Sequence, residues 1–303
     1  MTVTPQLSEE VEAALRHGRP VVALETTLVS HGFPGAQGVQ VALAAEARVR
    51  QAGAVPATIG IMDGAVRAGL TPAELERFAS AGPEARKAGP RDLAACVVQG
   101  ALGATTVGGT LAVCRLAGIG FMATGGTGGV HRRFAESLDI SADLPQIART
   151  RALVVSSGVK SILDVPATAE LLETLGVPVL GWRTGTLPLF FSAAGGPPVS
   201  AVVTAAKEAA LIIAAHWQLN GSSGVLLTRP PEPSLEIEPV IAEAVARVES
   251  QGVRGQSVTP AVLALVHELT GGCSAEVNRQ LIEDNAGLAA EVAVAYSAAA
   301  ADG

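Results

Sequence analysis

Short apolar runs alternate along this chain with longer segments in which apolar residues recur every three or four positions. Runs of four to eight apolar residues between turn signals are typical of buried strands, and the longer periodic segments are typical of helices packed against them. The predicted strands cover residues 21–24, 56–62, 120–124, 152–156, 178–182 and 224–228. The predicted helices cover residues 8–18, 38–51, 71–78, 168–175, 201–217, 237–251 and 259–298, with a further one introduced at 103–107 and a break in the last at 271–274.

This alternation predicts an α/β fold, with a mainly parallel central sheet, helices on both of its faces and a helical carboxyl-terminal region. The chain shows no internal repeat and no linker long enough to divide it, so residues 1–303 are predicted to form a single α/β domain. In sheets of this kind, ligands bind beyond the carboxyl ends of the strands. Candidate functional residues are therefore expected where the predicted strands end.

Composition narrows the class of partner. The 303 residues are 49% hydrophobic but only 3% aromatic, and 34 are glycine, which suits many short strand–helix units packed through small side chains. A net charge of −7 without a run of basic residues argues against nucleic-acid binding, so a small-molecule substrate is predicted. The absence of a secretory pattern, of a long apolar stretch and of a CxxC pair predicts a cytoplasmic protein with no membrane partner.

Lysine is rare in this chain, and Lys160 has the most informative position. It ends the apolar run at residues 152–160, and Ser161-Ile-Leu-Asp follows, where a helix is predicted to begin. At the first turn of a helix the positive end of the dipole would lower the pKa of the amine. A neutral amine is a nucleophile that can form an imine, whereas a guanidinium stays charged. The alternative is a solvated lysine that follows a strand.

Two other charged residues are candidates. Glu25 follows the strand at 21–24, and a carboxylate that leaves a buried strand into a cleft can acquire a raised pKa and act as a general acid or base. A helix cap or surface acid is the alternative. Lys87 is placed on a polar loop before a helix, where it could bind a phosphate or simply be solvated. Glycine-rich segments at 105–110 and 124–133 could bring backbone amides close to an anion, but neither fits a nucleotide-binding pattern.

A short polar turn carries candidate metal ligands. Asp139, Ser141 and Asp143 place two carboxylates and a hydroxyl before a predicted turn of helix. Oxygen ligands of this kind suit Mn²⁺ or Mg²⁺, with water completing the coordination. The alternative is that Ser141 or Asp143 caps the next helix. Asn285, in the carboxyl-terminal helices, could reach a cleft, although its position alone indicates little.

Several short motifs are distributed over nearly the whole chain. They are His31-Gly-Phe-Pro, Pro56-Ala-Thr-Ile, Gly103-Ala-Thr-Thr-Val, Asp139-Ile-Ser-Ala-Asp-Leu and Lys160-Ser-Ile-Leu-Asp. In these motifs the chain resembles the pseudouridine-5′-phosphate glycosidase family, which is also known through its indigoidine-synthesis relatives. It departs from the family at Gly35-Ala-Gln-Gly and Arg229-Pro-Pro-Glu-Pro, so the resemblance predicts the lysine chemistry more firmly than base recognition.

The resemblance implies reversible cleavage of the C-glycosidic bond of pseudouridine 5′-phosphate to uracil and ribose 5-phosphate, by a homotrimer with an α/β fold that uses Mn²⁺. It implies that Lys160 is the nucleophile, Glu25 the proton donor and Asp139 the metal ligand. It further implies substrate contacts from Lys87, Val107, Ser141, Ala142 and Asp143. Two alternatives stay open: a class I aldolase-like sugar-phosphate lyase on a (β/α)₈ barrel, and a sugar-phosphate-binding regulatory protein without catalysis.

Overall fold

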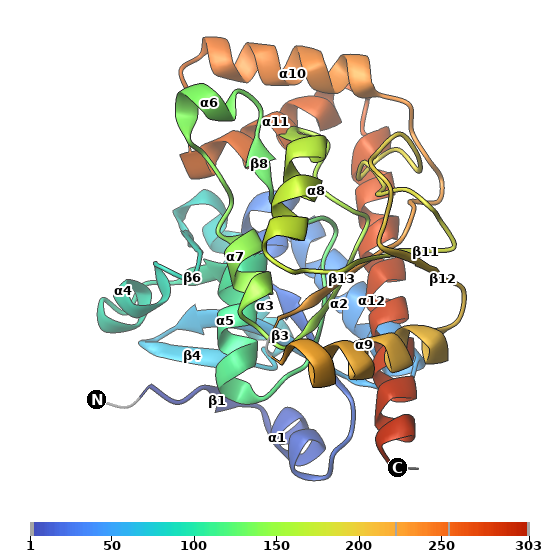
Figure 1. Ribbon diagram of the computed structural model, residues 1–303. Coiled ribbons are helices and arrows are strands. Elements are labelled where there is room, and N and C mark those ends of the chain that lie inside the picture. The colour runs from blue at the N-terminus through green and yellow to red at the C-terminus, as the bar shows by residue number, and fades with distance from the viewer. Residues whose placement is uncertain (1–2, 222, 254, 302–303) are drawn as a thin grey trace.

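The computed structural model describes residues 3–221, 223–253 and 255–301 (Figure 1). In this part of the chain eleven strands form one sheet, in the spatial order β1-β4-β3-β2-β7-β9-β13-β11-β12, with β6 beside β3 and β5 beside β6. The strands of the sheet are β1 (Gln6–Leu7), β2 (Val21–Glu25), β3 (Val55–Met62), β4 (Ala65–Ala68), β5 (Arg86–Ala88), β6 (Gly103–Thr105), β7 (Phe121–Ala123), β9 (Leu153–Ser156), β11 (Val179–Trp182), β12 (Ala201–Val203) and β13 (Val225–Thr228). A separate antiparallel pair joins β8 (Val130–His131) to β10 (Leu163–Asp164).

From β3 to β12 every strand in the spatial order runs parallel to its neighbours, whereas β4 and β6 run antiparallel to β3. All residues of β2, β3, β9 and β13 are buried, as expected for parallel strands covered on both faces. Ala123 of β7 is paired with Leu24 of β2 on one side and with Val155 of β9 on the other. The carboxyl ends of these three strands therefore lie side by side, and the predicted fold class is confirmed.

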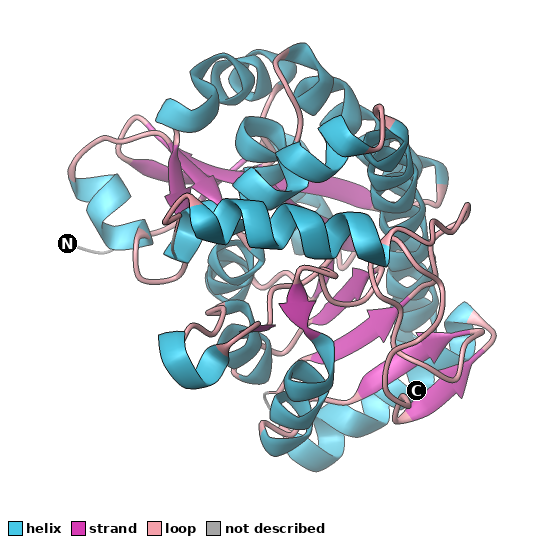
Figure 2. Ribbon diagram, turned by 90° about the horizontal axis from the view of Figure 1, so that it is seen from above, coloured by secondary structure: helices cyan, strands magenta, loops and turns pink. Residues whose placement is uncertain are grey.

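Helices cover both faces of the sheet (Figure 2). α12 packs against β2, β7, β9 and α2, and Figure 1 shows it running along most of the molecule. α5 contacts β2 and β3 and packs against α7, and α10 packs on α11. The helices are α1 (Glu9–Arg16), α2 (Ala36–Gln51), α3 (Pro72–Ala81), α4 (Leu93–Val98), α5 (Val107–Ala117), α6 (Phe134–Ser137), α7 (Asp143–Ala148), α8 (Val165–Thr174), α9 (Ala206–Asn220), α10 (Glu238–Ser250), α11 (Val258–Leu269) and α12 (Cys273–Ala301), with short turns of π-helix at η1 (Leu28–Gly32) and 3₁₀-helix at η2 (Gly82–Glu84) and η3 (Gly255–Ser257).

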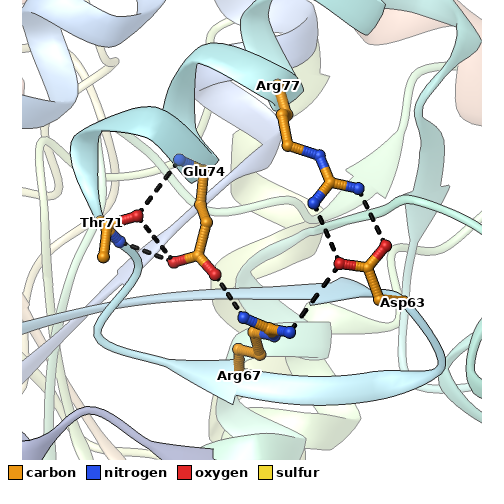
Figure 3. Close-up of polar contacts among 5 residues, drawn as sticks. All are labelled: Asp63, Arg67, Thr71, Glu74 and Arg77. Carbon is orange, nitrogen blue, oxygen red and sulfur yellow. Dashed lines mark hydrogen bonds and ion pairs between the residues drawn. The ribbon is translucent and has the colours of Figure 1, made fainter.

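The start of α3 shows how local sequence fixes an element (Figure 3). The Thr71 hydroxyl accepts a hydrogen bond from the Glu74 backbone N–H at 3.3 Å, and the Glu74 carboxylate accepts one from the Thr71 N–H at 2.8 Å. This reciprocal capping satisfies two backbone donors that the first turn of a helix leaves without intrahelical partners. Glu74 also pairs with Arg67, and Arg77 pairs with Asp63 at 2.9 Å, so the same helix is tied to the β3–β4 hairpin.

Three local predictions were wrong. The helix predicted over residues 201–217 begins only at Ala206, because residues 201–203 pair with β11 as strand β12. Lys87 lies in strand β5, beside β6, and not on a loop. No helix begins at Ser161: β9 ends at Ser156, and α8 begins only at Val165. In each case pairing with a distant segment decides the structure, and apolar periodicity does not encode such pairing.

The helical carboxyl-terminal region and its break are confirmed. α11 ends at Leu269, Gly271 and Gly272 have φ values of 59° and 89°, and α12 begins at Cys273. Among the described residues, no helix combines the length and the hydropathy needed to cross a membrane.

Candidate active site

A cavity of about 600 Å³ lies beyond the carboxyl ends of β2, β7 and β9. Each of these strands or the segment after it contributes a polar side chain to the wall, and α11 and α12 contribute apolar ones such as Leu263 and Ile282. Asn285, which the sequence suggested could reach a cleft, is not part of the wall, but eight other candidate residues line this one cavity: Glu25, Lys87, Val107, Asp139, Ser141, Ala142, Asp143 and Lys160. The structure therefore brings them together, whatever role each one has.

Glu25 is the last residue of β2, and only 6% of it is exposed. Burial raises the pKa of its carboxyl group. Lys160, the hydrogen bond from Thr124 and Lys87 act in the opposite direction, and the nearby charge of Asp143 adds to the increase. A buried carboxyl whose pKa is raised in this way keeps its proton at higher pH than a surface glutamate, which is the property of a general acid.

Lys160 lies four residues beyond the end of β9, in a segment that runs beside the glycine-rich segment after β7. Its backbone N–H donates to the carbonyl oxygen of Thr127 at 3.1 Å. The predicted effect of a helix dipole on Lys160 is wrong, because α8 begins at Val165 and is capped by Asp164. The groups near Lys160 are instead Glu25 and Lys87, with which it interacts electrostatically.

Lys87, in β5, lines the same cavity. Burial lowers the pKa of its amine, and the charge of Lys160 lowers it further, whereas Asp143, Glu25 and Asp139 oppose the change. The cavity thus contains two amines and three carboxylates whose charges interact. Such a concentration of coupled ionisable groups in a cleft is typical of functional sites.

Asp143 connects two segments of the wall. Its Oδ1 accepts a hydrogen bond from the N–H of Gly108, at the start of α5, at 2.7 Å, and its Oδ2 accepts one from Gly128 at 2.9 Å. Val107, the first residue of α5, is buried beside this contact, and Ala142 precedes α7. The carboxylate of Asp143 therefore holds the glycine-rich segment against α5, in addition to facing the cavity.

The prediction that Ser141 or Asp143 caps the next helix was wrong, because the N-cap residue of α7 is Ala142, which makes no side-chain cap. The Ser141 hydroxyl accepts a hydrogen bond from the N–H of Asp143, the first residue of α7, at 3.2 Å. Both residues also line the cavity.

Asp139 is the predicted metal ligand, and one side chain near it can also bind a metal. Its Oδ2 lies 3.7 Å from Nδ1 of His131, and both residues line the cavity. Within the described residues, no group of three or more His, Cys, Asp or Glu side chains could hold a metal ion. A carboxylate and an imidazole fit Mn²⁺, provided that water supplies most of the coordination.

Sequence reasoning missed three residues of the wall. Thr124 donates a hydrogen bond to Glu25 at 2.5 Å, and Phe190 packs over Gly126 beside Lys160. Asn278 of α12 is 4% exposed, lines the cavity and makes no side-chain hydrogen bond with any described residue. Thr124 lies in a glycine-rich segment whose sequence indicates a role for its backbone amides alone, whereas nothing in the sequence around Asn278 or Phe190 distinguishes them from core residues.

A model of the family described as indigoidine synthase A-like proteins matches residues 10–295. The chain belongs to this family. Pseudouridine-5′-phosphate glycosidase from Herpetosiphon aurantiacus is 46% identical to it over 294 residues, which cover 95% of this chain and 97% of the relative. The protein of the same name from Escherichia coli is 45% identical over 296 residues, or 96% of this chain and 95% of the relative. The prediction of this family is confirmed, and so is the prediction that the chain is an enzyme.

Two solved structures have the same fold. The prealnumycin C-glycosynthase AlnA, in complex with ribulose 5-phosphate, superposes with a TM-score of 0.90 at 41% identity and full coverage of both chains. An indigoidine synthase A-like protein from Thermotoga maritima superposes with a TM-score of 0.88 at 36% identity, over 97% of both chains. The two curated relatives are thus named glycosidases of pseudouridine 5′-phosphate, and one solved relative is named a C-glycosynthase and was solved with ribulose 5-phosphate bound.

Proposed function

We propose that this protein reversibly cleaves the C-glycosidic bond of pseudouridine 5′-phosphate, giving uracil and ribose 5-phosphate. One observation carries this proposal: the buried carboxyl of Glu25 and the amine of Lys160 share one cavity and interact electrostatically. The names of the relatives in the family support the same reaction.

The carbon–carbon linkage explains why an amine is needed. Ordinary glycosidases protonate a leaving oxygen or nitrogen, and uracil attached through carbon offers neither. In the proposed route Lys160 bonds to C1′ of the sugar, the bond between C1′ and the ring oxygen breaks, and the oxygen takes up a proton. The product is an open-chain sugar attached to the lysine nitrogen.

Glu25 is the proposed proton donor in the next step. It protonates C5 of uracil, the lone pair of the lysine nitrogen forms a C=N bond to C1′, and the bond between C1′ and C5 breaks. Water then adds to this imine, ribose 5-phosphate leaves as the aldehyde, and the Lys160 amine is restored. Burial of Glu25 supports its role, because the raised pKa keeps a proton available where a surface glutamate would have lost it.

Two further contacts follow from the wall of the cavity. Lys87, together with the N–H groups of the glycine-rich segments, is proposed to bind the phosphate. The amide of Asn278 offers a donor and an acceptor to the cavity, which complements the N–H and carbonyl groups at the edge of uracil. Val107, Ser141, Ala142 and Asp143 are proposed to contact the substrate by virtue of family resemblance and of their place in the wall.

Mn²⁺ is the proposed cofactor, held by Asp139 with His131 beside it and water as its other ligands. When bound, the ion supplies positive charge and orders water in the cavity. A homotrimer is the proposed assembly, and light scattering coupled to size-exclusion chromatography measures it directly.

The aldolase-like alternative is disfavoured by the sheet. A (β/α)₈ barrel closes on itself, whereas this sheet is open, with β1 and β12 at the two ends of its strand order. The regulatory alternative predicts that Lys160→Ala binds substrate as well as the parent protein and that neither releases uracil. An assay that follows uracil release by absorbance, with the parent protein and with Lys160→Ala, distinguishes the enzyme from the regulatory protein.

The decisive experiment is borohydride trapping with substrate, followed by peptide mass analysis. Wild-type protein is expected to carry a reduced sugar adduct on Lys160. Lys160→Arg should keep the positive charge but trap nothing, because a guanidinium does not become a neutral nucleophile. Lys207→Arg is the matched control, since Lys207 is exposed on α9, away from the cavity, and should trap as well as wild type. An active preparation that traps no adduct on Lys160 would disprove the mechanism.

A further inference from the structure

Asn285 lies within α12, is fully buried and is not part of the cavity wall. Its side chain nevertheless reaches both segments that leave β7 and β9. Nδ2 donates to the carbonyl oxygen of Thr124 at 2.9 Å and lies 3.4 Å from that of Gly125. It also donates to Oγ of Ser157 at 3.2 Å. One amide therefore connects α12 to the first residues of both segments.

Each of these segments carries a group that the proposed reaction uses. Thr124 donates to Glu25 at 2.5 Å, and Lys160 lies on the segment after β9. The two segments run together, because the N–H of Thr127 donates to the carbonyl oxygen of Gly158 and the N–H of Lys160 donates to that of Thr127, both at 3.1 Å. Asn285 bonds to the first residue of each segment, where the two segments leave the sheet.

The chemistry of an amide suits this position. A short neutral side chain with two N–H donors can bond to more than one oxygen at once, which an apolar or hydroxyl side chain of similar size cannot do. Leucine has the same number of side-chain heavy atoms in a similar branched shape, although its methyl groups are larger, and it would leave the buried carbonyl oxygen of Thr124 without this donor.

We propose that Asn285 is a positioning residue, which fixes the Thr124 hydroxyl and the Lys160 segment relative to Glu25 without touching the substrate. This role rests on the proposed function, because it concerns the presentation of two residues of that mechanism. Misplacement of a reacting group by about 1 Å can lower a rate about 100-fold. Loss of the amide is therefore expected to change kcat much more than KM.

The test compares Asn285→Leu with Thr228→Val. Thr228 is fully buried in β13, outside the cavity wall, and its hydroxyl donates to the carbonyl oxygen of Leu180 at 3.0 Å. Both variants thus lose a buried hydrogen bond to a backbone carbonyl, but only the bond of Asn285 lies next to the segments that carry Thr124 and Lys160. Melting temperature, kcat, KM and the rate of borohydride-trapped adduct formation are measured for each variant and for wild type.

Asn285→Leu is expected to lower kcat and the trapping rate by about 10- to 100-fold, with KM changed less than about threefold. Thr228→Val should lower the melting temperature about as much as Asn285→Leu does, and it should keep kcat within about twofold of the wild-type value. If Asn285 acts through the Thr124 hydroxyl, then Asn285→Leu and Thr124→Val are not additive: the double variant loses less activity than the product of the two single losses. A merely structural role predicts additive losses.

The positioning role is overturned if Asn285→Leu matches Thr228→Val in kcat, or if the cycle with Thr124→Val is additive. Should Asn285→Leu fail to fold, Ser157→Ala removes one contact of the amide and is expected to lower kcat about two- to fivefold at unchanged KM; an unchanged kcat overturns the role as well. If the wild-type protein forms no adduct, the proposed function itself is disproved. If the wild-type protein forms the adduct no faster than Asn285→Leu does, only the positioning role is disproved.

Discussion

The hydroxyl of Thr124 donates a hydrogen bond of 2.5 Å to Oε1 of Glu25, so the ends of β7 and β2 are joined inside the cavity. This bond stabilises the ionised carboxylate, whereas burial, the larger effect, stabilises the protonated acid. The pKa of Glu25 is therefore raised in the folded protein, and this has a cost in stability that grows as pH rises.

Glu25→Gln is expected to raise stability at high pH while abolishing most activity. Because folding raises the pKa of Glu25, the folded state binds its proton more tightly than the unfolded state, and the free energy of unfolding falls as pH rises from the ordinary glutamate pKa through the raised one. Glutamine removes this loss. We expect a melting temperature about 1–3 °C above wild type near pH 8, no such gain near pH 4, and kcat lower by at least about 100-fold.

Glu46→Gln is the matched control for this prediction. Burial also raises the pKa of Glu46, which accepts a hydrogen bond from Thr58 and lies outside the cavity wall. The control should gain stability in the same pH range and keep kcat within about twofold. Full activity in Glu25→Gln would remove Glu25 from the mechanism.

Gly126→Ala is expected to disrupt the wall beside Lys160. A methyl group at Gly126 would lie 2.4 Å from Cδ2 of Phe190, so the Phe190 side chain has to move, whereas Cγ of Lys160, at 3.4 Å, would be in ordinary contact with it. We expect kcat to fall at least about tenfold, together with a lower melting temperature. At Gly185 no atom outside its immediate neighbours lies within 4 Å of the added methyl group, so Gly185→Ala should behave like wild type. Equal kinetics for the two variants would contradict tight packing at Gly126.

Asp143→Asn is expected to reduce both stability and kcat. Asparagine replaces one of the two acceptor oxygens with an amino group, which then faces the backbone N–H of Gly108 or Gly128. A buried donor without an acceptor costs about 1–3 kcal/mol, which urea denaturation measures. Asp164→Asn serves as the control, because asparagine caps a helix about as well as aspartate and α8 should keep its cap. Weaker substrate binding at unchanged stability would show that Asp143 contacts substrate without holding the two segments together.

Asp139→Asn is expected to weaken Mn²⁺ binding at least about tenfold. The free ion is measured by electron paramagnetic resonance during titration of the protein with manganese chloride. Asp63→Asn is a suitable control, because Asp63 pairs with Arg77 on the surface (Figure 3) and should leave the titration unchanged. Removal of metal with a chelator should lower wild-type activity, and added Mn²⁺ should restore it. Identical titrations of Asp139→Asn and wild type would exclude Asp139 as the ligand.

The sequence was sufficient to place Glu25 and Lys160 near the ends of buried strands, because a short apolar run ends where its burial ends. It was not sufficient to place Lys87. Strand β5 is only three residues long and exists through pairing with β6, and such pairing depends on residues far along the chain. The same limit applies to the start of α8, where β10 pairs with β8 before the helix begins at Val165.

The roles of polar residues on α12 were harder still to predict. Asn278 and Asn285 occur on the same helix, yet one lines the cavity and the other bonds to backbone behind it. The two residues are seven positions apart, so they lie on nearly the same face of α12, about two turns apart along its axis. The difference therefore comes from where each of them lies along the helix relative to β2, β7 and β9, which contacts in three dimensions fix. Hydrophobic periodicity indicates which side of a helix is buried, but not which buried polar group meets a ligand and which meets the main chain.

α12 follows every other helix and strand described here, although it closes one side of the cavity and holds the segments after β7 and β9. A ribosome therefore delivers β2, β7 and β9 before it delivers the helix that shelters them. During translation the growing polypeptide therefore contains Glu25 and Lys160 well before α12 completes the cavity around them, so the proposed reaction requires this helix to have left the ribosome.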